Sequence, residues 1–421
     1  EAGSFDLDAI RELGEPFEDL AAAVATLQRR VNDAESAWLI GPLQHRLASV
    51  EQELTQQSRL LANASTTVRL APALLGADAP RRYFVAFVTP AEARGLVGFM
   101  GNWAEITVTD GRLELTGFGT DEDLNRGGDD PDGRRITGPP EFIDLYGQFG
   151  LVQPDGTTGR VPWKNITMPP DLTVVGPVMA ELYPQSGGSP IDGVFVVDPA
   201  GIAALMRFSG PVRVDGLDRA LTSATVEQFI LKDQYLSMEG RTDLLDAIAR
   251  TVVADVLQTS LPEPTRLART FGPLVPTRGV MAWSTHPDEQ ALFTDLAMDG
   301  SLATWMGDDE AVIARNNGGA NKIDIYVTEE WEATADGVRV TFTNTAPATG
   351  LPDYVIGNTV GLPSGTSRTR YTLYTRREVV TLTVNGRDQP VAVATEQGFF
   401  AYTFVVDLAA GESFVLEWQL A

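Results

Sequence analysis

Residues 83–88 read Tyr-Phe-Val-Ala-Phe-Val, and residues 194–197 read Val-Phe-Val-Val. Apolar runs this short and continuous are typical of strands whose two faces are both buried. The second run leads into Asp198-Pro199, which supplies an N-cap and a first-turn proline for a helix. Strands alternating with helices in this way predict an α/β or α+β domain with a covered sheet.

A hairpin is expected beside the first of these strands. Two strand-like segments, 104–109 and 113–118, flank Asp110-Gly111. An Asp-Gly pair between such segments is a strong short-range hairpin signal.

The N-terminal part of the chain has a helical pattern. Leu20, Val24, Leu27 and Val31 recur at the spacing of one helix face, and Gly41-Pro42 interrupts the pattern before a second helical segment. Two helices joined by a short break predict an antiparallel hairpin, which would act as an arm or stalk.

The C-terminal part has a different sequence pattern. Helical segments are expected to continue to about residue 316, and short strand-like runs follow, the first over residues 323–327. Turn signals such as Asn385-Gly386 and Ala410-Gly411 separate these runs. This pattern predicts a β-sandwich. The expected fold is multidomain α+β: a helical hairpin arm or stalk over residues 1–78, a central α/β domain over 79–320, and a β-sandwich over 321–421.

Composition narrows the function classes. The chain of 421 residues carries a net charge of −25, which argues against binding nucleic acid or an anionic membrane surface through a basic field. It has no cysteine and only two histidines, His45 and His286, so thiolate chemistry is excluded and a histidine-based triad is not expected. No apolar run is long enough to span a membrane. Because the chain starts at Glu1, we expect an export signal or membrane anchor to precede it.

Several motifs carry a resemblance to a known family. They are Arg82-Tyr83-Phe84, Glu92-Ala93-Arg94 followed by Gly98-Phe99-Met100-Gly101, Asp192-Gly193-Val194-Phe195, Gly210-Pro211-Val212, Asp233-Gln234-Tyr235, Asn321-Lys322-Ile323-Asp324 and Asn344-Thr345-Ala346-Pro347. With these motifs the chain resembles the family catalogued as domain of unknown function 4012. The resemblance implies a single-pass membrane protein of the actinobacterial cell envelope, with its bulk outside the cytoplasm.

The order of elements in the central domain also resembles that of the LytR–CpsA–Psr transferases. Those enzymes attach glycopolymers from polyprenyl-pyrophosphate carriers to the cell wall. The resemblance implies a polyprenyl-phosphate-linked glycan or a cell-wall polymer as the partner. Magnesium could serve as cofactor, but the acidic ligands that those transferases use are not matched here, because Glu92 is the one obvious carboxylate in the loop. We therefore assign no metal ligand.

Glu92 and Arg94 are the candidate catalytic residues. They follow a buried strand, where α/β sheets usually place ligands. Arg94 could clamp a phosphate, with Glu92 orienting it or acting as a base. The alternative is a buried Glu–Arg pair that holds the loop.

The remaining candidates are substrate-binding residues. Gly98 and Gly101 would allow a ligand to approach the backbone closely. Arg241, by the transferase resemblance, would join Arg94 in holding an anion. Asn165 and Asp171 lie in a loop that could line a cleft.

Two functions remain open from the sequence. One is a membrane-anchored envelope protein that binds or transfers a phosphate-linked glycopolymer. The other is a non-catalytic envelope scaffold that binds partners. A glycoside hydrolase is a further, weaker alternative, because spacing does not single out a pair of carboxylates.

Overall fold

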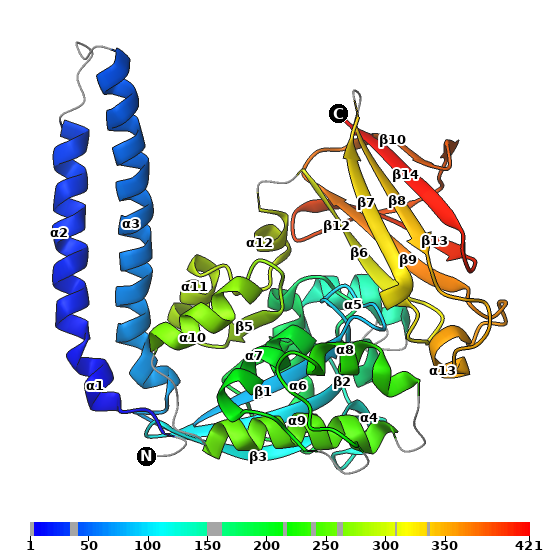
Figure 1. Cartoon of the computed structure of the whole chain (residues 1–421), viewed down its shortest axis with the longest axis horizontal. Helices are drawn as coiled ribbons and strands as arrows, with labels where there is room; N and C mark the ends of the chain where they lie inside the picture. The colour runs from blue at the N-terminus through cyan, green and yellow to red at the C-terminus, as the bar shows by residue number, and fades with distance from the viewer. Residues whose placement is uncertain are drawn as a thin grey trace.

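The computed structural model describes residues 4–33, 41–149, 162–213, 217–236, 241–258, 264–307, 310–334 and 337–421. Within helices, the side chains of residues 32–33, 41–50, 241–246, 258 and 264–265 lie outside the description. The chain is a mixed α/β protein with an N-terminal helical region and several sheets (Figure 1). None of the described helices is both long and apolar enough to cross a membrane.

The N-terminal region contains three helices: α1 (Leu7–Glu12), α2 (Gly14–Asp33) and α3 (Gly41–Leu74). Helices α2 and α3 lie side by side and project from the rest of the molecule (Figure 1). Gln28 donates to Thr55 across the pair at 3.1 Å. The predicted helical hairpin is thus present.

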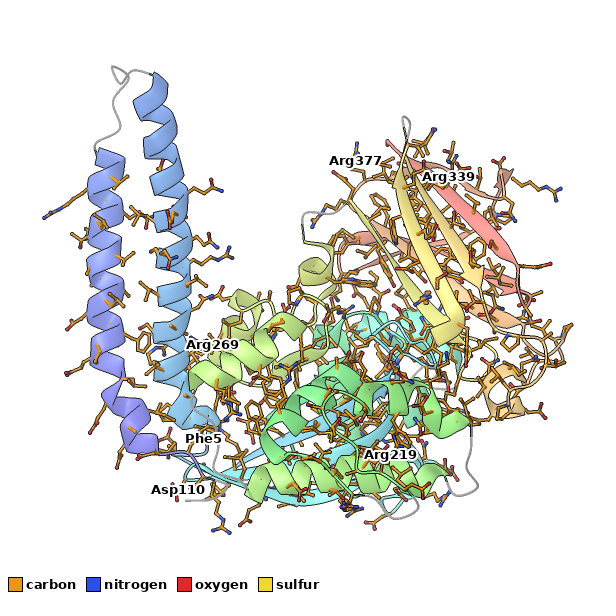
Figure 2. The ribbon with its side chains drawn as sticks, viewed as in Figure 1. Phe5, Asp110, Arg219, Arg269, Arg339 and Arg377 are labelled. Atoms are coloured by element: carbon orange, nitrogen blue, oxygen red, sulfur yellow. The ribbon has the colours of Figure 1, made fainter. Side chains whose placement is uncertain are left out.

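The short segment that precedes α1 is held at the base of these helices. The Phe5 amide donates to the Gly111 carbonyl at 2.9 Å, next to the tip of the β2–β3 hairpin (Figure 2). Asp6 then caps α1 by accepting from the amides of Asp8 and Ala9.

The central sheet has the strand order β3-β2-β1-β4-β5. Its strands are β1 (Arg81–Thr89), β2 (Phe99–Thr109), β3 (Arg112–Thr120), β4 (Gly193–Val197) and β5 (Val280–Ser284). Strand β1 is parallel to β4, and the other neighbours are antiparallel. At the predicted hairpin, Asp110 and Gly111 both have positive φ, 49° and 78°, as a tight turn requires.

Helices cover both faces of this sheet. One face, with Phe84 and Val194, packs against α6 (Leu172–Gln185). The other, with Phe87 and Val197, packs against α7 (Pro199–Ser209) and α9 (Arg241–Gln258). The other α-helices are α4 (Asp121–Arg126), α5 (Pro140–Tyr146), α8 (Val226–Leu231), α10 (Pro264–Phe271), α11 (Pro287–Asp295), α12 (Leu302–Met306) and α13 (Asp353–Ile356).

The C-terminal part consists of two antiparallel sheets, ordered β11-β10-β14-β8-β7 and β12-β13-β9-β6. Side chains of both sheets, among them Phe342, Tyr371 and Phe414, share one hydrophobic cluster. The strands are β6 (Ala311–Asn317), β7 (Val327–Ala333), β8 (Val338–Asn344), β9 (Ser367–Thr375), β10 (Val379–Val384), β11 (Arg387–Asp388), β12 (Ala392–Glu396), β13 (Phe399–Leu408) and β14 (Ser413–Leu420).

Two local predictions were wrong. Residues 311–317 form strand β6, although helical segments were expected up to about residue 316. Residues 324–326, expected to be part of a strand, form a 3-10 turn. Residues 311–314 form a continuous apolar run, Ala-Val-Ile-Ala, which fits a buried helix as well as a strand, and pairing with β9 makes it a strand.

Candidate functional site

Glu92 and Arg94 lie in the loop between β1 and β2, and they face each other. Arg94 Nη2 lies 2.8 Å from Glu92 Oε1, and the two residues are only 7% and 8% exposed. This is the arrangement of the structural alternative, a buried pair that holds the loop.

A third residue completes the cluster. Lys322 Nζ lies 2.5 Å from Glu92 Oε2, and Lys322 is 4% exposed. Lys322 stands in one of the family motifs, but nothing in the sequence connects it with Glu92, which is 230 positions away. We call Glu92, Arg94 and Lys322 the buried ionic triad.

The triad keeps Glu92 ionised. Burial by itself raises the pKa of a carboxyl group, but the charges and hydrogen bonds of Lys322 and Arg94 outweigh it and hold the pKa of Glu92 below its ordinary value. Since both oxygens already accept from cations, this carboxylate is poorly suited to take up a proton. The predicted role of Glu92 as a base therefore gains no support from its surroundings.

The loop that carries Glu92 is joined to residues 316–324, which lead out of β6. The Asn317 amide donates to the Ala93 carbonyl at 2.9 Å, and the Ala93 amide donates to Asp324 Oδ2 at 2.8 Å. Asn317 Nδ2 donates to the same carboxylate oxygen at 2.6 Å. The triad thus lies in a polar joint between the central sheet and the C-terminal sheets.

Gly98 and Gly101 differ in their surroundings. A Cβ at Gly98 would lie 2.3 Å from the backbone of Thr89, whereas a Cβ at Gly101 would meet nothing closer than the Phe99 ring at 3.8 Å. Gly98 therefore permits a close approach of two backbone segments within the protein. Its predicted use, close approach of a ligand, is not needed to explain it.

Asn165 and Asp171 lie in the loop that packs on residues 95–98. Asn165 Nδ2 donates to the Phe149 carbonyl at 3.2 Å. Asp171, 1% exposed, caps α6 by accepting from the Thr173 amide at 2.8 Å and also accepts from the Leu302 amide at 2.7 Å. Burial raises the pKa of Asp171. Both residues thus hold the loop in place.

Arg241 begins helix α9, but its side chain lies outside the described residues. The predicted convergence of Arg241 with Arg94 stays a prediction. Among the residues that the structure describes, no three acidic or histidine side chains gather in a way that could hold a metal ion.

A large apolar cavity, which was not predicted from the sequence, lies on the other face of the central sheet. Its volume is about 850 Å³, and strands β1, β2, β3, β4 and β5 form its floor under helices α7, α9 and α10. Among the described residues that line it, Thr67 has the one polar side chain. The others include Val85, Phe87, Phe195, Val197, Leu205, Val253, Val256, Leu257, Leu267, Phe271, Val275 and Pro276.

A second apolar cavity of about 380 Å³ adjoins the first. The two share Val85, Ile106, Leu113 and Phe195, and the second extends to Leu75 after the end of α3. The sequence does indicate that both faces of the sheet are apolar, because the strand runs are apolar at consecutive positions. The sequence does not show that the helices leave one face incompletely filled.

The comparisons with known proteins bear on the central part of the chain. Residues 78–235 match the model of a family of proteins of unknown function, DUF4012. This match confirms the family resemblance expected from the motifs in that segment. No curated protein matches the chain.

One solved structure, the transcriptional regulator yvhJ from Bacillus subtilis, aligns with 10% identity over 62% of this chain and 88% of its own. Its TM-score of 0.24 is too low to establish a shared fold.

Proposed function

We propose that this protein binds the polyprenyl chain of a phosphate-linked glycopolymer carrier in the cell envelope. The apolar cavity on the central sheet carries this proposal. Its volume of about 850 Å³ lies within the range of roughly 300–1,000 Å³ typical of ligand sites. A cavity lined almost wholly by aliphatic and aromatic side chains favours a ligand without polar groups along its length.

The proposal is for binding rather than transfer. Glu92 and Arg94, the predicted catalytic residues, are buried in the ionic triad and engaged by partners within the protein. The resemblance of the central domain to the LytR–CpsA–Psr transferases supports a polyprenyl-linked ligand, whereas the triad supports the loss or absence of their chemistry at this loop.

The proposed setting is extracytoplasmic. The family resemblance supports a protein anchored by a membrane segment that precedes Glu1, which would bring the cavity near the lipid carrier. The projecting α2–α3 hairpin suits a stalk between such an anchor and the central sheet (Figure 1).

Filling the cavity tests the proposal. In Val256→Trp, an indole replaces a small side chain of α9 that lines the cavity. We expect the affinity for polyprenyl phosphate in detergent micelles to fall by about tenfold or more, equivalent to about 1.4 kcal/mol. Calorimetry measures this affinity without using tryptophan fluorescence, which the substitution itself would change.

The matched control is Val380→Trp on β10, where the valine is 65% exposed and far from the cavity lining. It should bind like the wild type. Thermal unfolding of both variants checks that they are folded. Equal affinity in all three proteins, or no binding by the wild type, would contradict the proposal.

A further inference from the structure

A polar pocket, distinct from the two apolar cavities, lies between the central sheet and the C-terminal sheets. Its volume is about 200 Å³, and its charged lining residues are Arg94, Arg278, Arg315 and Glu329. Three cations and one acid thus surround a small space in a chain whose net charge is −25. An excess of positive charge at one place in so acidic a protein needs an explanation.

The most unusual residue of this pocket is Arg278, whose guanidinium group is buried without a carboxylate partner. It precedes β5, is 8% exposed, and has a positive φ of 60°. Its Nη2 donates to the carbonyls of Pro170 and Gly300, at 2.5 and 3.0 Å. Its Nε is buried and has no hydrogen-bond partner, and no carboxylate of the described residues lies within ion-pair distance of the guanidinium.

The Trp305 ring, whose centroid lies 4.7 Å from Arg278 Cζ, offsets part of the Arg278 charge, but it supplies no counter-charge. Burial lowers the pKa of Arg278 to about 10, and the nearby carboxylates of Asp171 and Asp299 offset only part of that effect. Those carboxylates are occupied elsewhere: Asp171 caps α6, and Asp299 accepts from Thr294 and Ser301. A buried cation with unused donors is costly unless an anion pairs with it.

The other two arginines differ in how fully they are engaged. Arg94 is held by Glu92, and its Nε is also buried without a partner. Arg315, on β6, is half-buried and donates through Nη1 to the Val327 carbonyl at 3.3 Å. Among the described residues, Arg278 Nη1 and Arg315 Nη2 donate to no partner, so both guanidinium groups retain a donor for a ligand, and Arg94 adds positive charge to the lining.

We propose that this pocket binds one phosphate group, either as inorganic phosphate or as the phosphomonoester of a sugar. Guanidinium groups suit phosphate because their planar arrays of N–H donors match its oxygens. The site goes beyond the lipid-binding function, because it needs no apolar chain. Residues 275–278 separate the two spaces: Val275 and Pro276 line the apolar cavity, while Thr277 and Arg278 line the polar pocket.

Binding here would link two parts of the molecule. Arg278 belongs to the central region, and Arg315 belongs to the first strand of the C-terminal sheets. A phosphate held by both would stabilise the folded state, since a ligand that binds only the folded form raises its stability.

The test titrates the whole protein at low ionic strength with inorganic phosphate and, in a second arm, with a sugar 1-phosphate. The variants are Arg315→Gln, Glu329→Gln and Arg278→Gln. The control is Arg377→Gln, at an exposed turn of the same region and away from the pocket (Figure 2).

We expect saturable 1:1 binding in at least one arm and a raised unfolding temperature with that ligand. Arg315→Gln should weaken binding by about tenfold, because a hydrogen bond to a charged group is lost. Glu329→Gln should strengthen it by removing a like charge, and Arg377→Gln should leave it unchanged. Arg278→Gln should abolish binding if it folds; if it does not, Arg315→Gln decides.

No saturable binding by the wild type in either arm would overturn the proposal. Equal losses in Arg315→Gln and Arg377→Gln would also overturn it, because they would indicate general charge attraction. These measurements use no lipid, so their failure is separable from failure of the cavity experiment.

Discussion

Glu92 shows how a residue's surroundings decide between two roles that the sequence leaves open. Its carboxylate oxygens each face a cation, Arg94 on one side and Lys322 on the other. A carboxylate in that position gains electrostatic stability only while both partners remain, because a buried charge without a partner is strongly unfavourable.

The triad predicts a stability effect at the residue scale. Glu92→Gln leaves two buried cations without their counter-charge and should lower the free energy of unfolding by about 3 kcal/mol. Urea denaturation followed by tryptophan fluorescence measures this change. Glu114→Gln is the matched control, because its pair with Arg112 is exposed, and we expect a loss of less than about 1 kcal/mol. Similar small losses for both variants would show that the triad does not hold the joint.

The glycines of the same loop give a second prediction. Gly98→Ala places a Cβ 2.3 Å from the Thr89 backbone. We expect it to lower the free energy of unfolding by about 2 kcal/mol or more, because the backbone at Thr89 or at residue 98 must move. Gly101→Ala has room and should be neutral or slightly stabilising. Thermal unfolding of the two variants makes the comparison. Equal tolerance of both changes would contradict the close approach described for Gly98.

At the scale of elements, α5 is joined to the C-terminal sheets through one buried carboxyl group. Tyr146 of α5 donates to Glu396 of β12 at 3.0 Å, and Tyr374 of β9 donates to it at 2.6 Å. Burial is the main cause that raises the pKa of Glu396 to about 7, against the lowering effect of these two hydrogen bonds. No cation forms an ion pair with Glu396 among the described residues.

This junction predicts a pH dependence. Because the folded state holds the proton of Glu396 more tightly than the unfolded state, its contribution to stability is complete below the ordinary pKa of 4.5 and is lost as the pH rises towards 7. The loss is on the order of 3 kcal/mol. Glu396→Gln should remove this part of the pH dependence, measured as unfolding free energy between pH 4.5 and 8. An unchanged pH profile in the variant would contradict the assignment.

At the scale of the whole molecule, sequence signals predicted those elements that are specified by residues close together in the chain. The apolar runs of β1 and β4, the Asp110-Gly111 turn and the Asp198 cap all lie within a few residues of what they specify. Strands β5 and β6 were not predicted, because a short apolar run in isolation fits a buried helix as well as a strand.

The functional features depend on longer distances. Lys322 meets Glu92 only because residues 316–324 fold back onto the β1–β2 loop. The apolar cavity depends on how far α9 and α10 stand from the sheet, which no pattern within either helix encodes. The three arginines of the polar pocket come from separate loops and strands, and their spacing in the sequence carries no signal.

The most direct test of the central claim is to locate a bound polyprenyl chain. A polyprenyl phosphate with a photoreactive group near its apolar end would be crosslinked to the protein, and the modified peptides would be identified by mass spectrometry. The cavity predicts labelling of peptides that contain Val85, Phe195 or Val256, with loss of labelling in Val256→Trp. Labelling confined to the α2–α3 hairpin or the C-terminal sheets, and unaffected by Val256→Trp, would contradict it.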